Sequence, residues 1–317
     1  MRTALLRRLT IAALAAGFAG TACAEDALKI AVGQRGGWEQ CVSELGQNAG
    51  IFKKHGLVLD VLYTQGSGET LQSVISASVD VGIGVGTHSV LGAFAKGAPV
   101  RAIGSSFTSA DDQFYYVAAD SPVRDMKDAD GRTIAISTTG SASNIFALAL
   151  AKHFGVALKP QPTGAYAATL TQTLTKQVDI GFSQAPFNLN AVDEGKIRIV
   201  AMGRDVPALR RMTSRLIIAN TVILAAKKPV LARYMQGFVE TLDWLYSDPA
   251  AIKAYAAWSG LPEGVAKRAP EFLTKDNLDP RHISGLDTIV ADAVTFKYLP
   301  APLSEAQLHE VIQIPLR

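Results

Sequence analysis

A short segment of this sequence occurs twice, 99 residues apart, and this repeat constrains the fold more than any other feature. Thr70-Leu71 is followed by Val79-Asp80-Val81-Gly82, and Thr169-Leu170 is followed by Val178-Asp179-Ile180-Gly181. Each copy predicts a helix, a polar turn and a short apolar strand that ends at glycine. The alternative is a chance repeat. A structural repeat would give two βαβ units whose carboxyl strand ends, where α/β sheets bind ligands, form a cleft.

The first 24 residues have the pattern of an export signal. Arg2, Arg7 and Arg8 precede an apolar run over 9–18, and small residues at 22–24 form a cleavage site. The run is too short to span a bilayer. We expect cleavage after Ala24 and a periplasmic protein. Lipidation at Cys23 is disfavoured, because Gly20 stands where a lipoprotein signal carries a large aliphatic residue.

Charge and cysteine content argue against several classes of function. The chain has 31 Lys and Arg against 28 Asp and Glu, and loss of the three leader arginines leaves 28 of each. A near-neutral surface without a basic run does not favour nucleic-acid binding. Cys41 alone remains after the leader, which predicts neither a disulfide scaffold nor a cysteine metal site. We predict no metal and no cofactor.

Alternating apolar residues and glycine-rich turns predict two α/β lobes. The first lobe has expected strands at 27–33, 57–63 and 79–85, with helices between them; the second has a strand at 133–137, helices at 143–154 and 166–177, and a strand at 178–183. We expect crossings between the lobes near 114–119 and 220–225. The first lobe would then comprise 25–115 and 222–317, and the second 116–221.

The segment from Gln47 to Asp60 resembles a known family. Together with Gly66-Ser67-Gly68 and the strand at 79–82, it is similar to the solute-binding proteins of nitrate/sulfonate/taurine and thiamine-precursor ABC importers. That family has a G-(L/I)-F-x-K-x-G-L-x-V stretch, then a Gly/Ser loop and an x-x-D-(V/I)-G strand. The resemblance implies an α/β type II periplasmic-binding-protein fold, with two doubly wound lobes and two hinge crossings. It also implies a monomer that serves an ABC permease in the inner membrane.

The first candidate binding loop follows the first expected strand. Trp38 would offer a platform for a planar ligand group, and Arg35 would bind an anion. The alternatives are a tryptophan packed on the lobe and a solvated arginine.

Two further loops of the first lobe open helices. Ser67 and Gly68 would present unshielded backbone N–H groups to an anion or carbonyl, the alternative being an ordinary helix cap. Thr87 and Ser89 are candidate hydroxyl donors. His88 would donate to an oxyanion, although a lone histidine is more often incidental.

The second lobe supplies the richest candidate loop. Thr139, Gly140 and Ser141 belong to a hydroxyl-rich segment over 137–144 that runs from a strand into a helix N-terminus, where negative charge is favoured. Ordinary capping would need one of these hydroxyls. Tyr166 would form an aromatic wall or pack in the core, and Gln184 ends the repeated strand.

These features predict a receptor for a small, anionic organic ligand, a sulfonate or carboxylate that could carry an aromatic body. An exported enzyme on the same fold, such as a relative of the thiamine-pyrimidine synthase, is the alternative. The sequence contains none of the common hydrolase, metalloprotease or phosphate-loop motifs. The synthase has a cysteine-rich iron-binding segment, for which this chain offers only Cys41. A ligand-sensing subunit of a membrane kinase or chemoreceptor is a third possibility.

Overall fold

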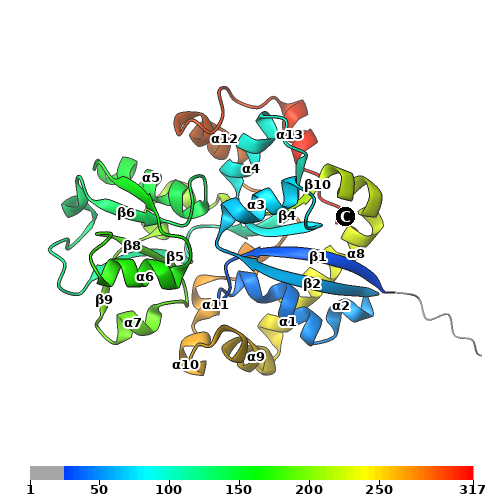
Figure 1. The fold of residues 1–317 in the computed structure, drawn as a ribbon, viewed down its shortest axis with the longest axis horizontal. Helices are drawn as coiled ribbons and strands as arrows, with labels where there is room; N and C mark the ends of the chain where they lie inside the picture. Colours follow the sequence, from blue (N-terminus) through cyan, green and yellow to red (C-terminus); the bar gives the residue numbers. More distant parts are fainter. Residues whose placement is uncertain (1–24, 317) are drawn as a thin grey trace, which may run out of the picture.

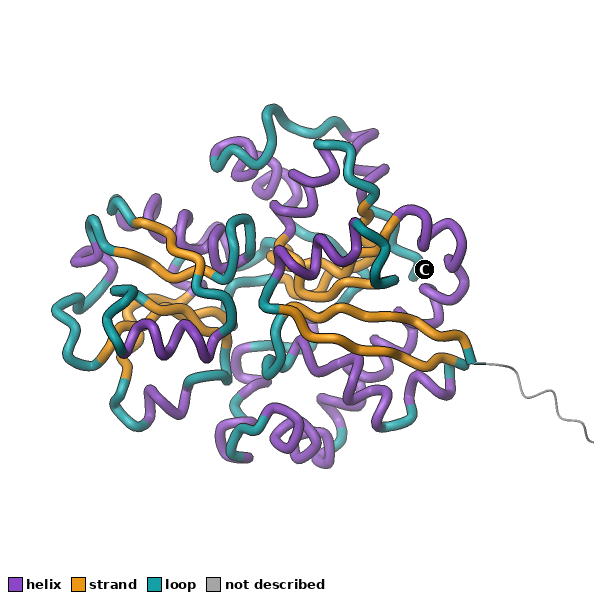
Figure 2. Tube along the Cα trace, viewed as in Figure 1, coloured by secondary structure: helices purple, strands orange, loops and turns teal. Residues whose placement is uncertain are grey.

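Two twisted sheets covered by helices lie side by side in the computed structural model (Figure 1), which describes residues 25–316. The predicted signal peptide lies outside the described residues. Loops gather between the two sheets (Figure 2), so that the strands of both lobes end toward a common boundary. Within residues 25–316, no helix combines the length and the apolar character needed to cross a membrane.

The first sheet has the strand order β2-β1-β3-β10-β4. Its strands are β1 (Asp26–Gly33), β2 (Leu57–Thr64), β3 (Val81–Gly86), β4 (Val100–Thr108) and β10 (Thr213–Asn220). β1 runs parallel to β2 and β3, whereas β10 runs antiparallel to β3 and β4. β3 and β10 are buried along their whole length, because helices cover both faces of this sheet.

The second sheet repeats this order. Its strands are β5 (Gln113–Ala118), β6 (Thr133–Ile136), β7 (Lys159–Pro162), β8 (Gly181–Gln184) and β9 (Ile197–Met202). A parallel bridge between Ile134 and Ile180, the residue before β8, joins the two-stranded sheet β6-β7 to the three-stranded sheet β8-β5-β9, and together they have the order β7-β6-β8-β5-β9. β5 is antiparallel to β8 and β9 and takes the place that β10 takes in the first lobe.

The repeat in the sequence is therefore structural. The Thr64 and Thr70 hydroxyls lie 2.7 Å apart in the first lobe, and the Thr163 and Thr169 hydroxyls lie 2.7 Å apart in the second. Thr70 and Thr169 also donate to backbone carbonyls four residues earlier, at 3.2 and 3.1 Å. Both lobes thus use the same threonine pair to hold a strand end against the start of the next helix.

Helices flank both sheets. The first lobe begins with η1 (Glu39–Cys41), α1 (Val42–Asn48), α2 (Ile51–Lys54), α3 (Ser67–Ile75) and α4 (Thr87–Ala95). The second lobe contains η2 (Met126–Ala129), α5 (Ala142–Phe154), α6 (Tyr166–Leu174) and α7 (Leu189–Asp193), followed by η3 (Gly203–Asp205) and η4 (Pro207–Leu209). The chain ends with α8 (Thr221–Ser247), α9 (Pro249–Ser259), α10 (Glu263–Ala266), α11 (Ala269–Phe272), η5 (Asp276–Leu278), α12 (Leu286–Thr295) and α13 (Glu305–Val311).

The C-terminal helices return to the first lobe. α8 packs on α1, β2 and β10, α12 packs on α4, and α13 packs on β4. α3 and α4 cover the opposite face of the first sheet from α1, α2 and α8 (Figure 1). Two polar contacts connect this C-terminal segment to the second lobe. Arg268 forms an ion pair with Asp193 at 2.9 Å, and the Tyr298 hydroxyl donates a hydrogen bond to Asn144 at 2.6 Å.

The crossings between the sheets lie earlier than the sequence suggested. β5 already belongs to the second sheet, and β10 already belongs to the first, so the chain crosses at 109–112 and 203–212. The expected boundaries at 115/116 and 221/222 are corrected accordingly. Asn220 ends β10 and caps α8 by accepting from Val222 N–H at 2.9 Å. The apolar stretch over 220–225 is therefore the first turn of a helix.

Candidate functional site

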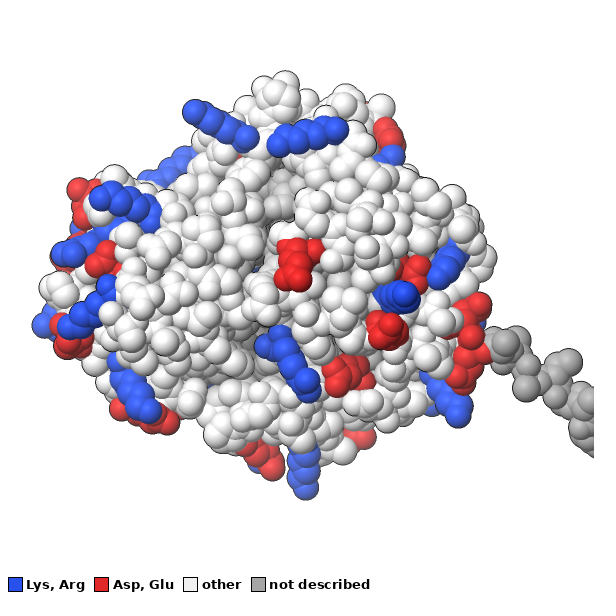
Figure 3. Space-filling model, viewed as in Figure 1, with Lys and Arg blue, Asp and Glu red and all other residues white. Residues whose placement is uncertain are grey.

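A small cavity lies between the lobes, where strands of both sheets end. Its wall comprises Gly33, Gln34, Gln40, Ser67, Gly84, Gln113, Ser137, Ser141, Ala142, Ser143, Tyr166, Phe182, Gln184 and Arg215. The volume is about 20 Å³, which holds about one water molecule. The lobes contact each other directly around this cavity, through the hydrogen bonds from Gly68 to Thr138 and from Gln40 to Gln184. Few charged side chains border the junction on the face shown in Figure 3.

One helix from each lobe begins at this cavity. α3 begins at Ser67, and Ser141 caps α5 by accepting from Asn144 N–H at 3.2 Å. The Gly68 N–H donates to Thr138 Oγ1 across the junction at 3.3 Å. Both helix starts therefore lie at the same boundary. Since free N–H groups and the helix dipole favour negative charge at such ends, the arrangement suits an anionic group.

The hydroxyls at the start of α5 form a network of their own. The Ser141 and Ser143 hydroxyls lie 2.9 Å apart, and Ser143 Oγ accepts from Ser137 N–H at 3.0 Å. Gly140 N–H donates to Asn144 Oδ1 at 2.9 Å. Some of these hydroxyls thus stabilise the conformation of the loop. Ser137, Ser141 and Ser143 also line the cavity. Thr139 is exposed in this turn and is not part of the cavity wall.

Two glutamines and a tyrosine connect the lobes across the cavity. Gln40 Nε2 donates to Gln184 Oε1 at 3.3 Å, and the Tyr166 hydroxyl donates to the same oxygen at 2.5 Å. Tyr166 also contacts the rings of Phe182 and Phe187. It both packs in the core and reaches the cavity, which combines the two expectations for this residue.

A cluster of buried charged side chains lies beside the cavity. Arg215 Nε donates to Glu39 Oε2 at 2.6 Å, and Arg215 Nη2 donates to Asp112 Oδ2 at 2.5 Å. Glu39 also accepts from the Ser106 hydroxyl. The Phe107 ring lies 4.7 Å from the guanidinium carbon of Arg215. The side chains of Arg215, Glu39 and Asp112 are 4, 0 and 0% exposed, so three charges are held out of water beside the cavity.

Burial and the attraction between opposite charges shift the pKa values in this cluster in opposite directions. Burial raises the pKa of Asp112 to about 6, although the Arg215 guanidinium opposes the shift. Burial would lower the pKa of Arg215, but the Asp112 and Glu39 carboxylates raise it above its ordinary value. Arg215 is therefore always charged, whereas the pKa of Asp112, about 6, lies close to neutral pH.

Several polar atoms around the cavity have no hydrogen-bond partner among the described residues. They are Arg215 Nη1, Gln34 Oε1, Gln113 Oε1 and, in the ion cluster, Asp112 Oδ1. Buried polar groups in proteins almost always have partners. Arg215, Gln34 and Gln113 line the cavity, so a bound molecule is positioned to supply what these atoms lack.

Two candidates from the first loop lie elsewhere. Trp38 is fully buried in the core of the first lobe, where its Nε1–H donates to the Tyr246 hydroxyl at 3.0 Å. Arg35 has a side chain that is 53% exposed; it donates to the Trp258 carbonyl at 3.2 Å and lies over the Trp258 ring. The structure brings neither residue to the cavity wall. The short helix η1 starts at Glu39 and turns Trp38 inward beneath α8 and α9.

The candidates at the start of α4 lie near the junction but outside the cavity wall. Thr87 donates to the Thr213 carbonyl at 2.6 Å. His88 is buried beside Tyr298, and burial lowers its pKa to about 4. Ser89 packs against Gly140, where a Cβ would lie 2.3 Å from the Ser89 hydroxyl oxygen. These residues support the lobe junction.

No sequence motif predicted the charged part of the site. Glu39 and Arg215 are 176 residues apart, and Asp112 is 103 residues from Arg215. None of the three residues belongs to a recognisable motif. Their neighbourhood depends on β10 entering the first sheet between β3 and β4, which periodicity alone does not reveal.

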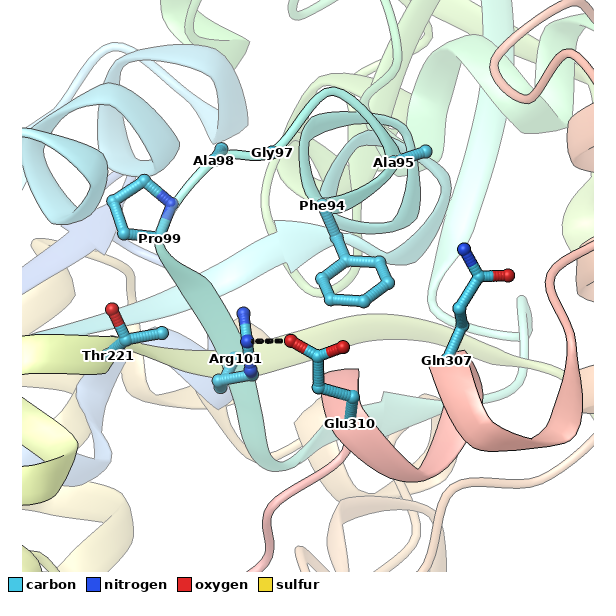
Figure 4. Close-up of a pocket in the computed structure, with 9 residues that line it drawn as sticks. All are labelled: Phe94, Ala95, Gly97, Ala98, Pro99, Arg101, Thr221, Gln307 and Glu310. Atoms are coloured by element: carbon cyan, nitrogen blue, oxygen red, sulfur yellow. Dashed lines mark hydrogen bonds and ion pairs between the residues drawn. The ribbon is translucent and has the colours of Figure 1, made fainter.

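A larger hollow of about 450 Å³ lies on the outer surface of the first lobe (Figure 4). Residues of α4, β4 and α13 surround it, and its one arginine, Arg101, is paired with Glu310. It contains no residue of the second lobe, and its guanidinium already has an acidic partner. Within residues 25–316, no cluster of three or more His, Cys, Asp and Glu side chains could hold a metal ion.

Two α/β lobes with a cavity at their facing strand ends define the periplasmic-binding-protein fold. The family model described as NMT1/THI5 like matches residues 45–252. The chain belongs to this family. Comparison with curated protein sequences gave no match.

Solved structures with the same fold cover most of the chain. The alkanesulfonate-binding protein SsuA from Xanthomonas axonopodis pv. citri, bound to MOPS, is 18% identical with a TM-score of 0.74, over 91% of this chain and 98% of that one. The aliphatic sulphonate-binding protein SsuA from Escherichia coli is 18% identical with a TM-score of 0.69, over 89% and 91%. The nitrate-binding protein NrtA from Synechocystis PCC 6803 is 12% identical with a TM-score of 0.70, over 90% and 86%.

Proposed function

We propose that this protein is a periplasmic solute receptor that binds a small organic anion, a sulfonate or carboxylate, between its lobes and delivers it to an ABC importer. The observation that carries the proposal is the unpartnered Nη1 of the buried Arg215 at a cavity where α3 and α5 also begin. A guanidinium and two helix N-termini are the groups that proteins use to bind carboxylates and related oxyanions.

The residues of the cavity wall also support a mechanism in which closure of the lobes signals that the ligand is bound. Gln40 and Ser67 come from the first lobe, whereas Ser141, Tyr166 and Gln184 come from the second. A ligand that bonds both sets stabilises the closed state relative to the open one, and a permease can recognise that state. The proposed partner is therefore a membrane permease, and the receptor acts as a monomer.

Relatives of this fold also support a receptor over an enzyme. Solved structures with the same fold include sulfonate-binding and nitrate-binding proteins. Cys41, the cysteine on which the synthase alternative would depend, is buried in the core of the first lobe, and burial raises the pKa of its thiol. A buried thiol of this kind is a poor nucleophile and a poor metal ligand.

Binding of defined anions to the protein without residues 1–24 tests the proposal. Ethanesulfonate, acetate, benzoate and nitrate are titrated by calorimetry, with sodium chloride at equal ionic strength as the control. We expect at least one organic acid to bind and to raise the melting temperature by several degrees, as preferential binding to the folded state requires. If no member binds and native mass spectrometry of the periplasmic protein finds no small acid, the proposed ligand class is wrong.

A further inference from the structure

The charges in the Glu39–Arg215–Asp112 cluster do not balance. One guanidinium faces two carboxylates, and all three groups are buried at the lobe junction. With both carboxylates ionised, the cluster carries a net charge of −1. An anion that bonds Arg215 Nη1 would bring the buried assembly to −2, and unpaired charge is expensive to hold out of water.

The geometry indicates which group relieves this excess. Glu39 uses both carboxylate oxygens, one for Arg215 and one for the Ser106 hydroxyl. Asp112 uses only Oδ2 for Arg215, and its Oδ1 is buried without a partner among residues 25–316. Asp112 therefore has a free oxygen that can take a proton without breaking a hydrogen bond, whereas Glu39 has none.

We propose that Asp112 is a specificity residue of the cleft, which takes up one proton when a singly charged anion binds to Arg215. This inference rests on the proposed function and adds the charge state of the ligand. The proton comes from the solvent and adds to a carboxylate oxygen of Asp112, so the net charge of the assembly stays at −1. A dianion would bring a second charge that Asp112 cannot offset, and the site should therefore select against sulfate-like ions.

The groups around Asp112 are consistent with this role. Arg215 of β10, Glu39 of η1 and Tyr166 of α6 are the charged or titratable groups that interact with it electrostatically, and Asp111 precedes it in the chain. Among these side chains, Arg215 favours the ionised form, as does a backbone hydrogen bond of Asp112 itself. Burial already brings the pKa of Asp112 to about 6, and an anion on the far side of Arg215 competes for the same positive charge. Little further change is needed to protonate Asp112 near neutral pH.

Calorimetry of the tightest-binding monoanion among ethanesulfonate, acetate, benzoate and nitrate tests the proposal. Titration at pH 7 in Tris and in imidazole, which ionise with different enthalpies, gives the number of protons exchanged. We expect uptake approaching one proton for each anion, and an affinity that falls by about tenfold per pH unit between pH 6.5 and 8. Sulfate should bind far more weakly than the monoanion at every pH.

Asp112→Asn supplies the matched variant, because asparagine has the shape of the protonated acid and no charge. It should bind the monoanion without proton uptake, with an affinity that does not change between pH 6.5 and 8, and more tightly than the wild type at pH 8. Asp60→Asn removes the same charge from an exposed position on β2 and should behave as the wild type.

The outcomes separate this inference from the proposed function. Binding to the wild type without proton uptake, or proton uptake that persists in Asp112→Asn, overturns the role of Asp112 and leaves the receptor intact. Equal affinity for sulfate and for the monoanion also overturns it. Failure of every anion to bind the wild type overturns the proposed function and this inference together.

Discussion

Asp80 and Asp179, 99 residues apart in the chain, make the same bond in the two lobes. Asp80 Oδ2 accepts from the backbone N–H of Lys29 on β1, and Asp179 Oδ2 accepts from the backbone N–H of Thr133 on β6, both at 2.9 Å. Each carboxylate follows a helix and holds the neighbouring parallel strand, Asp179 at the first residue of β6 and Asp80 within β1. The strands that these aspartates anchor carry the loops of the ligand cavity at their other ends.

Asp179→Ala should destabilise the protein by about 2 kcal/mol, because two hydrogen bonds to a charged acceptor, from the N–H and the hydroxyl of Thr133, are lost. Urea denaturation monitored by circular dichroism measures the change. Asp120→Ala is the control: Asp120 pairs with Lys176 on the surface, where both side chains are largely exposed, and its loss should leave stability unchanged. Equal effects of the two substitutions would show that Asp179 has no anchoring role.

Ser141→Asp should weaken binding of an anionic ligand by on the order of a thousandfold, because a fixed negative charge would lie in the cavity beside the ligand. Calorimetry with the best-binding anion measures the effect. Ser304→Asp is the matched control, since Ser304 also caps a helix, α13, but lies exposed on the first lobe. Aspartate is a good capping residue, so both variants should melt near the wild-type temperature. Unchanged affinity in Ser141→Asp would place the ligand's charge away from α5.

Gly86→Ala should oppose closure of the lobes. A Cβ at this position would lie 2.7 Å from the Gly140 carbonyl oxygen, a backbone atom of the other lobe. The lobes must move apart to admit it, so ligand affinity should fall at least tenfold. Small-angle scattering of the saturated protein should also show a larger radius of gyration. Gly264→Ala meets no atom within 4 Å and should bind and close as the wild type does. A compact, tightly binding Gly86→Ala variant would mean that the lobes close elsewhere.

His88 should make the fold sensitive to acid. Burial lowers its pKa to about 4, below the ordinary value of 6.5, so the unfolded chain takes up a proton at a pH where the native protein does not. Stability is therefore retained above pH 6.5 and lost as pH falls toward 4, by about 2 to 3 kcal/mol at pH 4.5. In His88→Gln, the loss of stability between pH 7 and pH 4.5 should be smaller by that amount. The exposed His309→Gln should show the wild-type loss, and an identical loss in both variants would contradict the role of His88.

The sequence could predict the parts of this molecule that depend on local pattern. Short segments of sequence predicted the repeated strand ends, the Gly-rich start of α3 and the hydroxyl-rich start of α5. Four of the residues predicted for the site line the cavity: Ser67, Ser141, Tyr166 and Gln184. The sequence did not predict the contacts that form only when the chain returns from the second lobe to the first. Arg215 reaches Glu39 and Asp112 only because β10 enters the first sheet, and Trp38 is buried only because α8 and α9 fold over it.

The position of β10 also dictates an order of assembly. This strand lies between β3 and β4, so the central part of the first sheet stays incomplete until residues 213–220 have joined it. The second sheet, in contrast, is built from the contiguous stretch between β5 and β9. A chain that emerges from its amino end can therefore finish the inserted lobe while the lobe that began first still lacks a strand. Completion of the enclosing lobe waits for the return of the chain, which delays the native state until more than two thirds of the polypeptide has been delivered.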